Sequence, residues 1–319
     1  MKVNVLLTGS SGFIGQNLRN YLEKNQKIQI SIFRLLRDNN AINFPERSIT
    51  WNTVDAAWLD SSKIDAIVHV AGIAHDFSGK YSEVNYDQVN FQLTKKLYQE
   101  FLGSRHTSKF IFMSSVKALS DEPKELLTED AVPSPKTPYG KSKLKAEQFI
   151  RSNQGNNKSS YILRPTMVYG PKNKGNLNTL YKFLSKGYPY PFGSFKNKRS
   201  FLSVNNLNFI ILQVLLGRVN PGDYNCADST DLSSVELVNL IGKAINKKPR
   251  VLNLSTSLIR GLASIGSKFS LPFNKQVLGK LTGSYCVSTE KILQTLAIKE
   301  LPYNIEDELV KTIRTFEEH

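Results

Sequence analysis

The chain has 319 residues, of which 40% are hydrophobic and 22% are charged, and 42 Lys and Arg against 27 Asp and Glu give a net charge of +15. This composition excludes a disordered or collagen-like protein, and the length predicts about two domains, or one large α/β domain with a smaller one attached. Cys226 and Cys286 are too few for a disulfide framework and lack metal-ligand spacing. We therefore expect a reducing, cytoplasmic location and no metal site.

No apolar segment is long enough to suggest a membrane span. The N-terminal run is too short for a signal-peptide core, and the run at residues 209–216 is about half the ~20 residues that cross a bilayer. The positive charge leaves nucleic acid, an anionic membrane surface and an anionic small molecule as partners. No zinc-finger, RNA-binding or helix-turn-helix motif accompanies it, so we expect no nucleic acid and no integral membrane association.

The first half of the chain alternates short apolar runs with amphipathic segments. Predicted strands cover residues 3–7, 28–36, 64–70, 110–113 and 161–163, and predicted helices cover residues 13–24, 84–102 and 138–151. This alternation is typical of βαβ units with a parallel sheet covered on both faces. We predict an α/β Rossmann fold, with a doubly wound parallel sheet, as a dinucleotide-binding domain over residues 1–165.

The second half of the chain has a different residue composition. Residues 170–200 are rich in Gly, Pro, Asn, Lys and Tyr, which is typical of a ligand-facing region. We expect residues 200–227, with a strand at 200–204, to rejoin the first sheet. The remaining segments are expected to form a smaller C-terminal substrate-binding lobe, made of residues 166–199 and 228–319, with helices at 232–246, 256–268 and 304–317.

A glycine-rich segment, Thr8–Gly15, lies between the first predicted strand and the first helix. Small residues let the backbone approach a pyrophosphate, and the helix N-terminus presents free N–H groups and a positive dipole end to it. A glycine triplet alone is weak evidence and could be a tight turn, but the strand–turn–helix context is the one a dinucleotide site requires. The predicted cofactor contacts are Gly9, Ser11, Gly12, Phe13, Ile14 and Gly15.

The end of the second strand bears on the choice of cofactor. An acidic residue about 20 residues after the loop would hold the ribose hydroxyls of NAD. Asp38 is present, but Arg34 and Arg37 surround the same corner. Arginine there can pair with a 2′-phosphate, so the sequence favours NADP(H), with NAD(H) as the second possibility. Ordinary solvated arginines are the alternative.

A serine hydroxyl, a tyrosine and a lysine form a candidate acid–base group. Ser114 and Ser115 end a predicted strand at the edge where ligands bind in open α/β sheets, and Tyr139 and Lys143 share one face of a helix. A phenol with a pKa of about 10 is a poor acid or base near neutrality, but an ammonium and an oxidised nicotinamide both favour the phenolate. Tyr139 and Lys143 alone could be an exposed helix face; with the glycine loop and the serine they predict a dehydrogenase-type site.

Several further blocks complete the pattern: residues 68–72, 84–85, 112–115, 163–171 and 199–204. With these blocks the chain resembles, over essentially its whole length, the extended short-chain dehydrogenases/reductases of the nucleotide-sugar epimerase/dehydratase type. The resemblance implies that Ser115, Tyr139 and Lys143 are catalytic and that the family's usual state, a homodimer, applies here.

The resemblance also implies binding residues. Ala71 and Gly72 would line the cofactor, and Pro165 and Met167 would pass beside the nicotinamide. Substrate contacts are implied for His75, Ser115, Asn176 and Arg199, with a turn residue and an ordinary surface charge as alternatives for the last two. His69, inside a predicted strand, is expected to be a packed residue rather than a catalyst.

Within the family, residues 115–117 and 138–147 are similar to a bacterial surface-polysaccharide subgroup, which suggests capsule or O-antigen synthesis. That subgroup contains both 4-epimerases and 4-ketoreductases. Arg34 and Arg37 favour an NADPH-dependent reductase that acts at C4 of a UDP-2-acetamido-2,6-dideoxy-4-hexulose, because an exchangeable NADPH suits net reduction. The alternative is a UDP-sugar 4-epimerase with tightly bound NAD, of the UDP-GlcNAc/UDP-GalNAc or UDP-Glc/UDP-Gal type. A non-enzymatic protein on the same fold would not need the intact triad.

Two positions depart from the pattern of UDP-hexose epimerases. Ala74 stands where many of them carry Lys, and Lys117 stands where Thr is common, which weakens the galactose/glucose reading. A diphosphate sugar and a dinucleotide would use only a few of the excess cations. Lys243, Lys247, Lys248 and Arg250 have no assigned partner; a solvated surface is the default, and an anionic membrane is the alternative.

Overall fold

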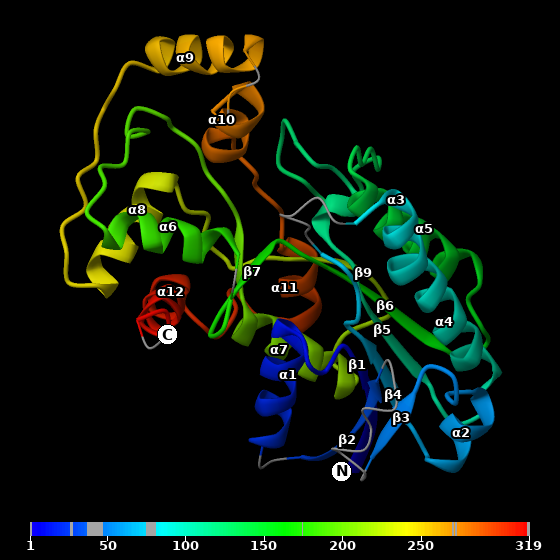
Figure 1. Ribbon diagram of the computed structural model, residues 1–319. Helices are drawn as coiled ribbons and strands as arrows, with labels where there is room; N and C mark the ends of the chain where they lie inside the picture. Colours follow the sequence, from blue (N-terminus) through cyan, green and yellow to red (C-terminus); the bar gives the residue numbers. More distant parts are fainter. Residues whose placement is uncertain are drawn as a thin grey trace.

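The computed structural model describes residues 2–25, 28–36, 47–74, 81–173, 175–269, 271 and 273–317. Its centre is a seven-stranded sheet in the order β3-β2-β1-β4-β5-β6-β9, in which every pairing is parallel (Figure 1). The strands are β1 (Lys2–Thr8), β2 (Gln29–Leu36), β3 (Ser48–Thr50), β4 (Ala66–His69), β5 (Lys109–Met113), β6 (Ser159–Pro165) and β9 (Gly222–Cys226).

Both faces of this sheet carry apolar side chains, so each face needs a layer of helices. Val3, Val5 and Leu7 of β1 pack on one face with α1 (Phe13–Glu23), α7 (Val204–Leu215) and α11 (Glu290–Leu296). Leu6 of β1 packs on the other face with α2 (Ala56–Ser61), α4 (Leu93–Gly103) and α5 (Pro138–Ser152). The predicted doubly wound Rossmann fold is confirmed, and its strand order reverses between β1 and β4.

The helix expected at residues 84–102 is interrupted. It consists of α3 (Glu83–Tyr86), a π-helical segment, η2 (Asp87–Gln92), and α4. Segments of this kind occur frequently at functional sites because the wider turn redirects side chains. None of the helices in the described part of the chain has the length and hydrophobicity needed to cross a membrane.

The strand expected at residues 200–204 does not join the large sheet. It forms β8 (Phe201–Ser203), which pairs with β7 (Met167–Tyr169) in a separate two-stranded sheet. The free edge of β6 is taken by β9 instead, where Pro165 lies opposite Cys226. Because β9 occupies that edge, β8 has only β7 beside it.

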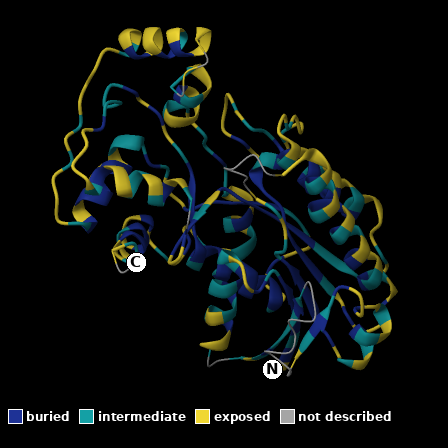
Figure 2. Ribbon diagram, in the orientation of Figure 1, coloured by how far each residue is buried: buried dark blue, intermediate teal, exposed yellow. Residues whose placement is uncertain are grey.

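Outside the sheet, α6 (Asn176–Ser185), α8 (Ser234–Ala244) and α12 (Ile305–Arg314) surround a separate apolar core. Next to it, α9 (Thr256–Lys268) and α10 (Lys275–Thr282) pack on Phe195 (Figures 1 and 2). The sequence indicated α8, α9 and α12 but not α6, α10 or α11. One segment assigned to the lobe packs elsewhere: Ile292 of α11 contacts the core beneath the large sheet.

Candidate active site

The glycine loop follows β1 at the carboxyl edge of the sheet. Gly9 has a φ of +65°, and a Cβ there would lie 2.8 Å from the Ala71 nitrogen. A Cβ on Gly15 would lie 2.1 Å from the Gly9 carbonyl oxygen, so both positions require glycine. Gly12 caps α1, with no side-chain cap and no acidic residue in the first turn. The cradle with its uncapped N–H groups fits a pyrophosphate.

A directed chain of hydrogen bonds ties this loop to β4. The Ala71 N–H donates to Thr8 Oγ1 (2.9 Å), which lies 2.8 Å from His69 Nδ1. His69 Nε2 lies 2.9 Å from Thr94 Oγ1, and the Thr94 hydroxyl donates to the Asn90 carbonyl (2.7 Å). The Thr94 proton is therefore committed, which assigns the His69 proton to Nε2. Burial, with a smaller effect of Lys143, lowers the pKa of His69 to about 3. The expectation that His69 is a packed residue is confirmed.

Ser115 and Tyr139 are brought together by the approach of α5 to β5. Ser115 follows β5 and caps a short 3-10 helix, and its side chain hydrogen-bonds to that of Tyr139. A Cβ on Gly140 would lie 2.4 Å from the Lys117 carbonyl oxygen, so the first turn of α5 touches this segment only because residue 140 is glycine. Burial raises the pKa of Tyr139 to about 12, against the lowering effect of the Ser115 hydrogen bond. The phenol is therefore protonated at neutral pH.

Lys143 lies one turn further along α5, almost completely buried. Its Nζ donates to the Met113 carbonyl at 2.8 Å and lies 4.9 Å from the centre of the Phe112 ring. A Cβ on Gly72 would lie 3.2 Å from the same Nζ. Lys143 thus occupies the space between the ends of β4 and β5. Burial lowers its pKa to about 8, with Glu147 acting in the opposite direction.

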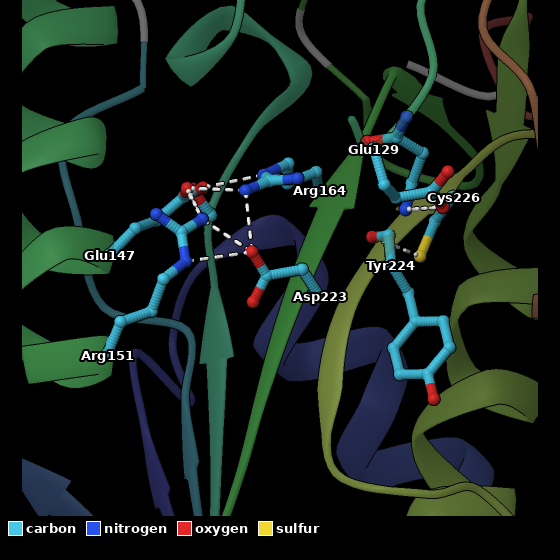
Figure 3. A network of polar contacts seen from close by, with 9 residues as sticks. Glu129, Glu147, Arg151, Arg164, Asp223, Tyr224 and Cys226 are labelled. Atoms are coloured by element: carbon cyan, nitrogen blue, oxygen red, sulfur yellow. Dashed lines mark hydrogen bonds and ion pairs between the residues drawn. The ribbon is translucent and has the colours of Figure 1, made fainter. Parts of the chain in front are cut away.

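Behind Lys143, a network of buried charges fixes α5 to the sheet (Figure 3). Arg164 of β6 donates from Nε and Nη2 to the two oxygens of Glu147 at 3.0 and 2.8 Å, and its Nη2 also donates to Asp223 of β9. Arg151 joins both carboxylates, and Ser114 donates to Glu147. Glu147 and Arg164 are at most 1% exposed. The network holds the helix that carries Tyr139 and Lys143 against β6 and against Ser114, which directly follows β5.

Asn90, in the π-helical segment, connects a second loop to α5. Its side chain accepts from the Ile73 N–H (2.8 Å) and donates to the Ile73 carbonyl (3.0 Å) and to Ser142 Oγ (3.0 Å). Ser142 in turn donates to the Tyr139 carbonyl at 2.8 Å. This fully buried amide therefore links the loop after β4 to the turn that carries Tyr139.

The opposite side of the site contains Lys117, Tyr285 and Arg199. Lys117 Nζ lies 4.6 Å from the centre of the Tyr285 ring, and burial lowers its pKa. Burial also raises the pKa of Tyr285, with smaller contributions from Asp121 and Tyr139. Arg199 pairs with the backbone of Tyr285, and its guanidinium donates to the carbonyls of Gly283 and Lys280. Arg199 therefore belongs to the same side of the site as Lys117.

A hollow of about 800 Å³ lies in the lobe between α9, α10 and residues 194–196. Its lining includes Lys196, Arg260 and Lys275, together with Gly283, whose carbonyl accepts from Arg199. Three cations and no carboxylate line it, so the hollow suits an anionic ligand.

The other predicted residues have varied surroundings. Pro165 ends β6 and is buried, and Met167 begins β7 and is exposed. Asn176 is exposed at the first position of α6. Burial lowers the pKa of Arg34, Arg19 lowers it further, and Glu23 opposes both.

Two predicted contacts, Arg37 and His75, lie outside the described residues. The argument for a 2′-phosphate site used Arg34 and Arg37 together, so it stays a prediction.

Sequence reasoning assigned no role to Asn90, Gly140, Glu147, Arg164 or Tyr285. Glu147 had a usable signal, because it lies four residues after Lys143 on the same helix face. Nothing local marks the others: Arg164 and Tyr285 come from distant segments, and Asn90 acquires its position from the π-helical segment.

Comparisons with known proteins show which proteins this chain is similar to. A model of the NAD dependent epimerase/dehydratase family matches residues 5–227. A UDP-glucose 4-epimerase of Vibrio cholerae is 28% identical over 99% of this chain and 96% of that protein. The N-acetyl-alpha-D-glucosaminyl-diphospho-ditrans,octacis-undecaprenol 4-epimerase of Escherichia coli is 29% identical over 92% of this chain and 85% of that protein.

Solved structures share the fold. The UDP-glucuronic acid 4-epimerase of Bacillus cereus in complex with NAD has a TM-score of 0.74 at 19% identity and 99% coverage of both chains. The Bordetella bronchiseptica enzyme WbmG in complex with NAD has a TM-score of 0.74 at 15% identity, with 100% of this chain and 95% of that chain covered. Because the family model spans well over half of the sequence, this chain belongs to the NAD-dependent epimerase/dehydratase family.

Proposed function

We propose that this protein is a UDP-sugar 4-epimerase that uses a tightly bound NAD. The observation that carries the proposal is the hydrogen-bonded pair of Ser115 and Tyr139, which lies at the same sheet edge as the glycine cradle. The Vibrio cholerae and Bacillus cereus proteins support it, because both are named as 4-epimerases and the second is described with NAD.

The residues of this chain have distinct roles in the proposed reaction. Bound NAD would supply reversible hydride transfer at C4 of the sugar. Tyr139 Oη would take the proton of the C4 hydroxyl as that carbon is oxidised and return it when the carbon is reduced from the other face. Ser115 would donate a hydrogen bond to the C4 oxygen.

Lys143 would favour the deprotonated form of Tyr139. Without a cofactor the pKa of Tyr139 lies far above neutrality, and the Lys143 ammonium is held at the Met113 carbonyl. The positive nicotinamide and the ammonium would together lower that pKa toward the working pH. Because burial lowers the pKa of Lys143 to about 8, its charge, and with it the activity, should decline above about pH 8.

For the cofactor we propose NAD(H), and the NADP(H) preference expected from the sequence stays a prediction. The Bacillus cereus structure is described with NAD, and Arg37, on which the 2′-phosphate argument also rests, lies outside the described residues. Arg37→Ala discriminates between the two cofactors: if a 2′-phosphate is bound, affinity for NADPH falls by tenfold or more, roughly the value of one charged hydrogen bond, while that for NADH does not change. Equal changes for both cofactors would remove the NADP argument.

The UDP-sugar would extend from Tyr139 toward Arg199 and the basic hollow. Arg199 would have to exchange its contacts with the Gly283 and Lys280 carbonyls for a diphosphate, a change suited to its planar set of donors. The homodimer and the cytoplasmic location expected from the sequence stay predictions.

A 4-keto reductase is the second candidate, and Lys117 is the observation that favours it. A half-buried cation beside Tyr285, at a position where Thr is common in UDP-hexose epimerases, sets this site apart from a simple galactose/glucose epimerase. Both reactions use Ser115, Tyr139 and Lys143, so the cofactor balance separates them. An epimerase regenerates NAD within each turnover, whereas a reductase consumes one NADPH for each ketone that it converts to an alcohol.

The deciding experiment offers both reactions to the same preparation. UDP-GlcNAc and UDP-Glc are incubated separately without added nicotinamide, and the C4 epimers are separated chromatographically. We expect interconversion by the wild type and none by Tyr139→Phe. Stoichiometric NADPH oxidation with a UDP-4-keto-6-deoxy-N-acetylhexosamine, without any interconversion of epimers, would replace the epimerase proposal by the reductase.

A further inference from the structure

One helix of the lobe has two apolar faces. Ile259, Ala263 and Gly266 of α9 are buried, and this face packs against α10 and Phe195. A second face, which we call the apolar ridge, is 53–65% exposed and consists of Leu258, Leu262, Ile265 and Phe269. The spacing of four, three and four residues places these four side chains in one stripe along the helix.

Exposed apolar side chains are concentrated in the part of the sequence that contains the ridge. Eight of the fifteen exposed large apolar side chains in the described part of the chain come from residues 252–281. In the figures, α9 lies at the margin of the lobe, with α10 between it and the large sheet (Figures 1 and 2). An exposed apolar stripe such as the ridge marks an interaction site.

The same segment has a one-sided charge. Residues 237–289 contain no Asp or Glu, and they contain eight basic residues: Lys243, Lys247, Lys248, Arg250, Arg260, Lys268, Lys275 and Lys280. All eight are exposed, and none forms an ion pair with any residue that the structure describes. Over half of the net charge of +15 therefore arises in a segment that also exposes leucines and phenylalanine.

The exposed apolar ridge and the excess of basic residues together indicate which kind of partner fits this region. A second copy of this chain on a twofold axis would place the same patch against itself, so basic segments without a carboxylate would face each other and repel. An anionic lipid surface instead accepts both features. Arg260 and Lys275 line the hollow on the other side of α9, but Lys268 lies beside Phe269 and can approach the headgroups while the stripe of Leu, Ile and Phe enters the acyl boundary.

We infer that α9 is an interfacial helix that docks this protein on an anionic phospholipid bilayer. The apolar ridge enters the headgroup–acyl boundary, and Lys268, next to Phe269, contacts the lipid phosphates from the rim of the ridge. The ridge and the basic hollow lie on opposite sides of α9. The hollow is lined by Thr256, Arg260 and Ser264, and helical spacing places these residues away from the ridge.

The test is co-sedimentation of the full-length protein with vesicles. Phosphatidylglycerol/phosphatidylcholine vesicles are compared with phosphatidylcholine alone, at low and high salt. We expect binding to the anionic vesicles only, weakened by salt. The double variant Leu262→Glu, Ile265→Glu should bind at least about tenfold less, and Lys268→Gln about fivefold less, the contribution of one cation.

A matched control adds the same two charges elsewhere. Leu126→Glu, Val132→Glu changes two exposed apolar residues outside α9 and should bind like the wild type. Epimerase activity on a free UDP-sugar should be the same for both double variants, so vesicle binding is tested independently of the proposed function.

Three results would overturn the inference. The wild-type protein could fail to bind anionic vesicles, it could bind phosphatidylcholine vesicles equally well, or the control variant could lose as much binding as the Leu262→Glu, Ile265→Glu variant. Light scattering of the free proteins identifies the alternative. If the wild type does not bind vesicles and the Leu262→Glu, Ile265→Glu variant converts a dimer into a monomer, the ridge is an interface between copies instead.

Discussion

The two helical regions α5 and α9–α10 use charge in opposite ways. On α5, Lys143 and Glu147 are 4% and 0% exposed, and each has partners on the sheet: the Met113 carbonyl for Lys143 and Arg164 for Glu147. On α9 and α10 the cations are exposed and lack carboxylate partners among the described residues. A buried charge without its partner is costly, so the charges of α5 determine geometry, whereas those of α9–α10 are free to act on an external partner.

The largest effect should come from the reacting group on α5. Tyr139→Phe removes the proton carrier and should lower kcat by about 10³-fold, the usual contribution of a positioned acid–base group. Retention of NAD, measured by nucleotide release on denaturation, should be unchanged, and Tyr188→Phe in the lobe should retain full activity. A Tyr139→Phe variant with more than about a tenth of the wild-type rate would contradict the assigned role.

The second-largest effect should come from the buried charge network of Glu147 and Arg164. Glu147→Gln leaves Arg164 with one carboxylate partner fewer in a dry environment and should cost about 3 kcal/mol in the free energy of unfolding, measured with urea. Loss of the negative charge should also lower the pKa of Lys143 further, so the alkaline limb of the kcat profile should move to lower pH. Glu290→Gln, an exposed change on α11, should shift neither quantity. Equal effects of the two variants would contradict the positioning role of Glu147.

His69 should make the stability depend on pH. Burial lowers its pKa to about 3, so the folded protein keeps a neutral ring while the unfolded chain binds a proton below about pH 6.5. Above pH 6.5 the ring is neutral in both states and does not make the stability depend on pH. As the pH falls from 6.5 toward 3, only the unfolded chain binds the proton, so the free energy of unfolding falls by about 1.4 kcal/mol per pH unit. Between pH 7 and pH 5 the wild type should lose about 2 kcal/mol more than His69→Gln in urea unfolding. Equal losses would show that the ring is charged in the folded state.

The smallest effect should come from the exposed cations. Lys268→Gln should change the free energy of unfolding by less than about 0.5 kcal/mol, because no ion pair among the described residues is lost. The measurement is urea unfolding at neutral pH beside Glu147→Gln. A loss above about 1 kcal/mol would show that charge on α9 also stabilises the fold, and the contrast with α5 would disappear.

Several structural features could be predicted from the sequence because each depends on neighbouring residues. The glycine loop and the Tyr139–Lys143 pair lie within single turns, and the βαβ alternation appears in short windows. The failures have a common cause. The separate pairing of β7 with β8, the packing of α11 on the large sheet and the helix α6 inside a Gly- and Asn-rich stretch all depend on contacts with remote segments.

The sequence by itself therefore determined the fold class, the cradle for a pyrophosphate and the helix face that carries Tyr139 and Lys143, because local periodicity and spacing specify them. Only the tertiary structure decided how that face is held. Glu147, Arg164 and Asp223 meet because β6 and β9 are neighbours, and Gly140 reaches the Ser115 segment because α5 crosses the end of β5. Those contacts join residues that are far apart in the chain, and strand order, not spacing, brings them together.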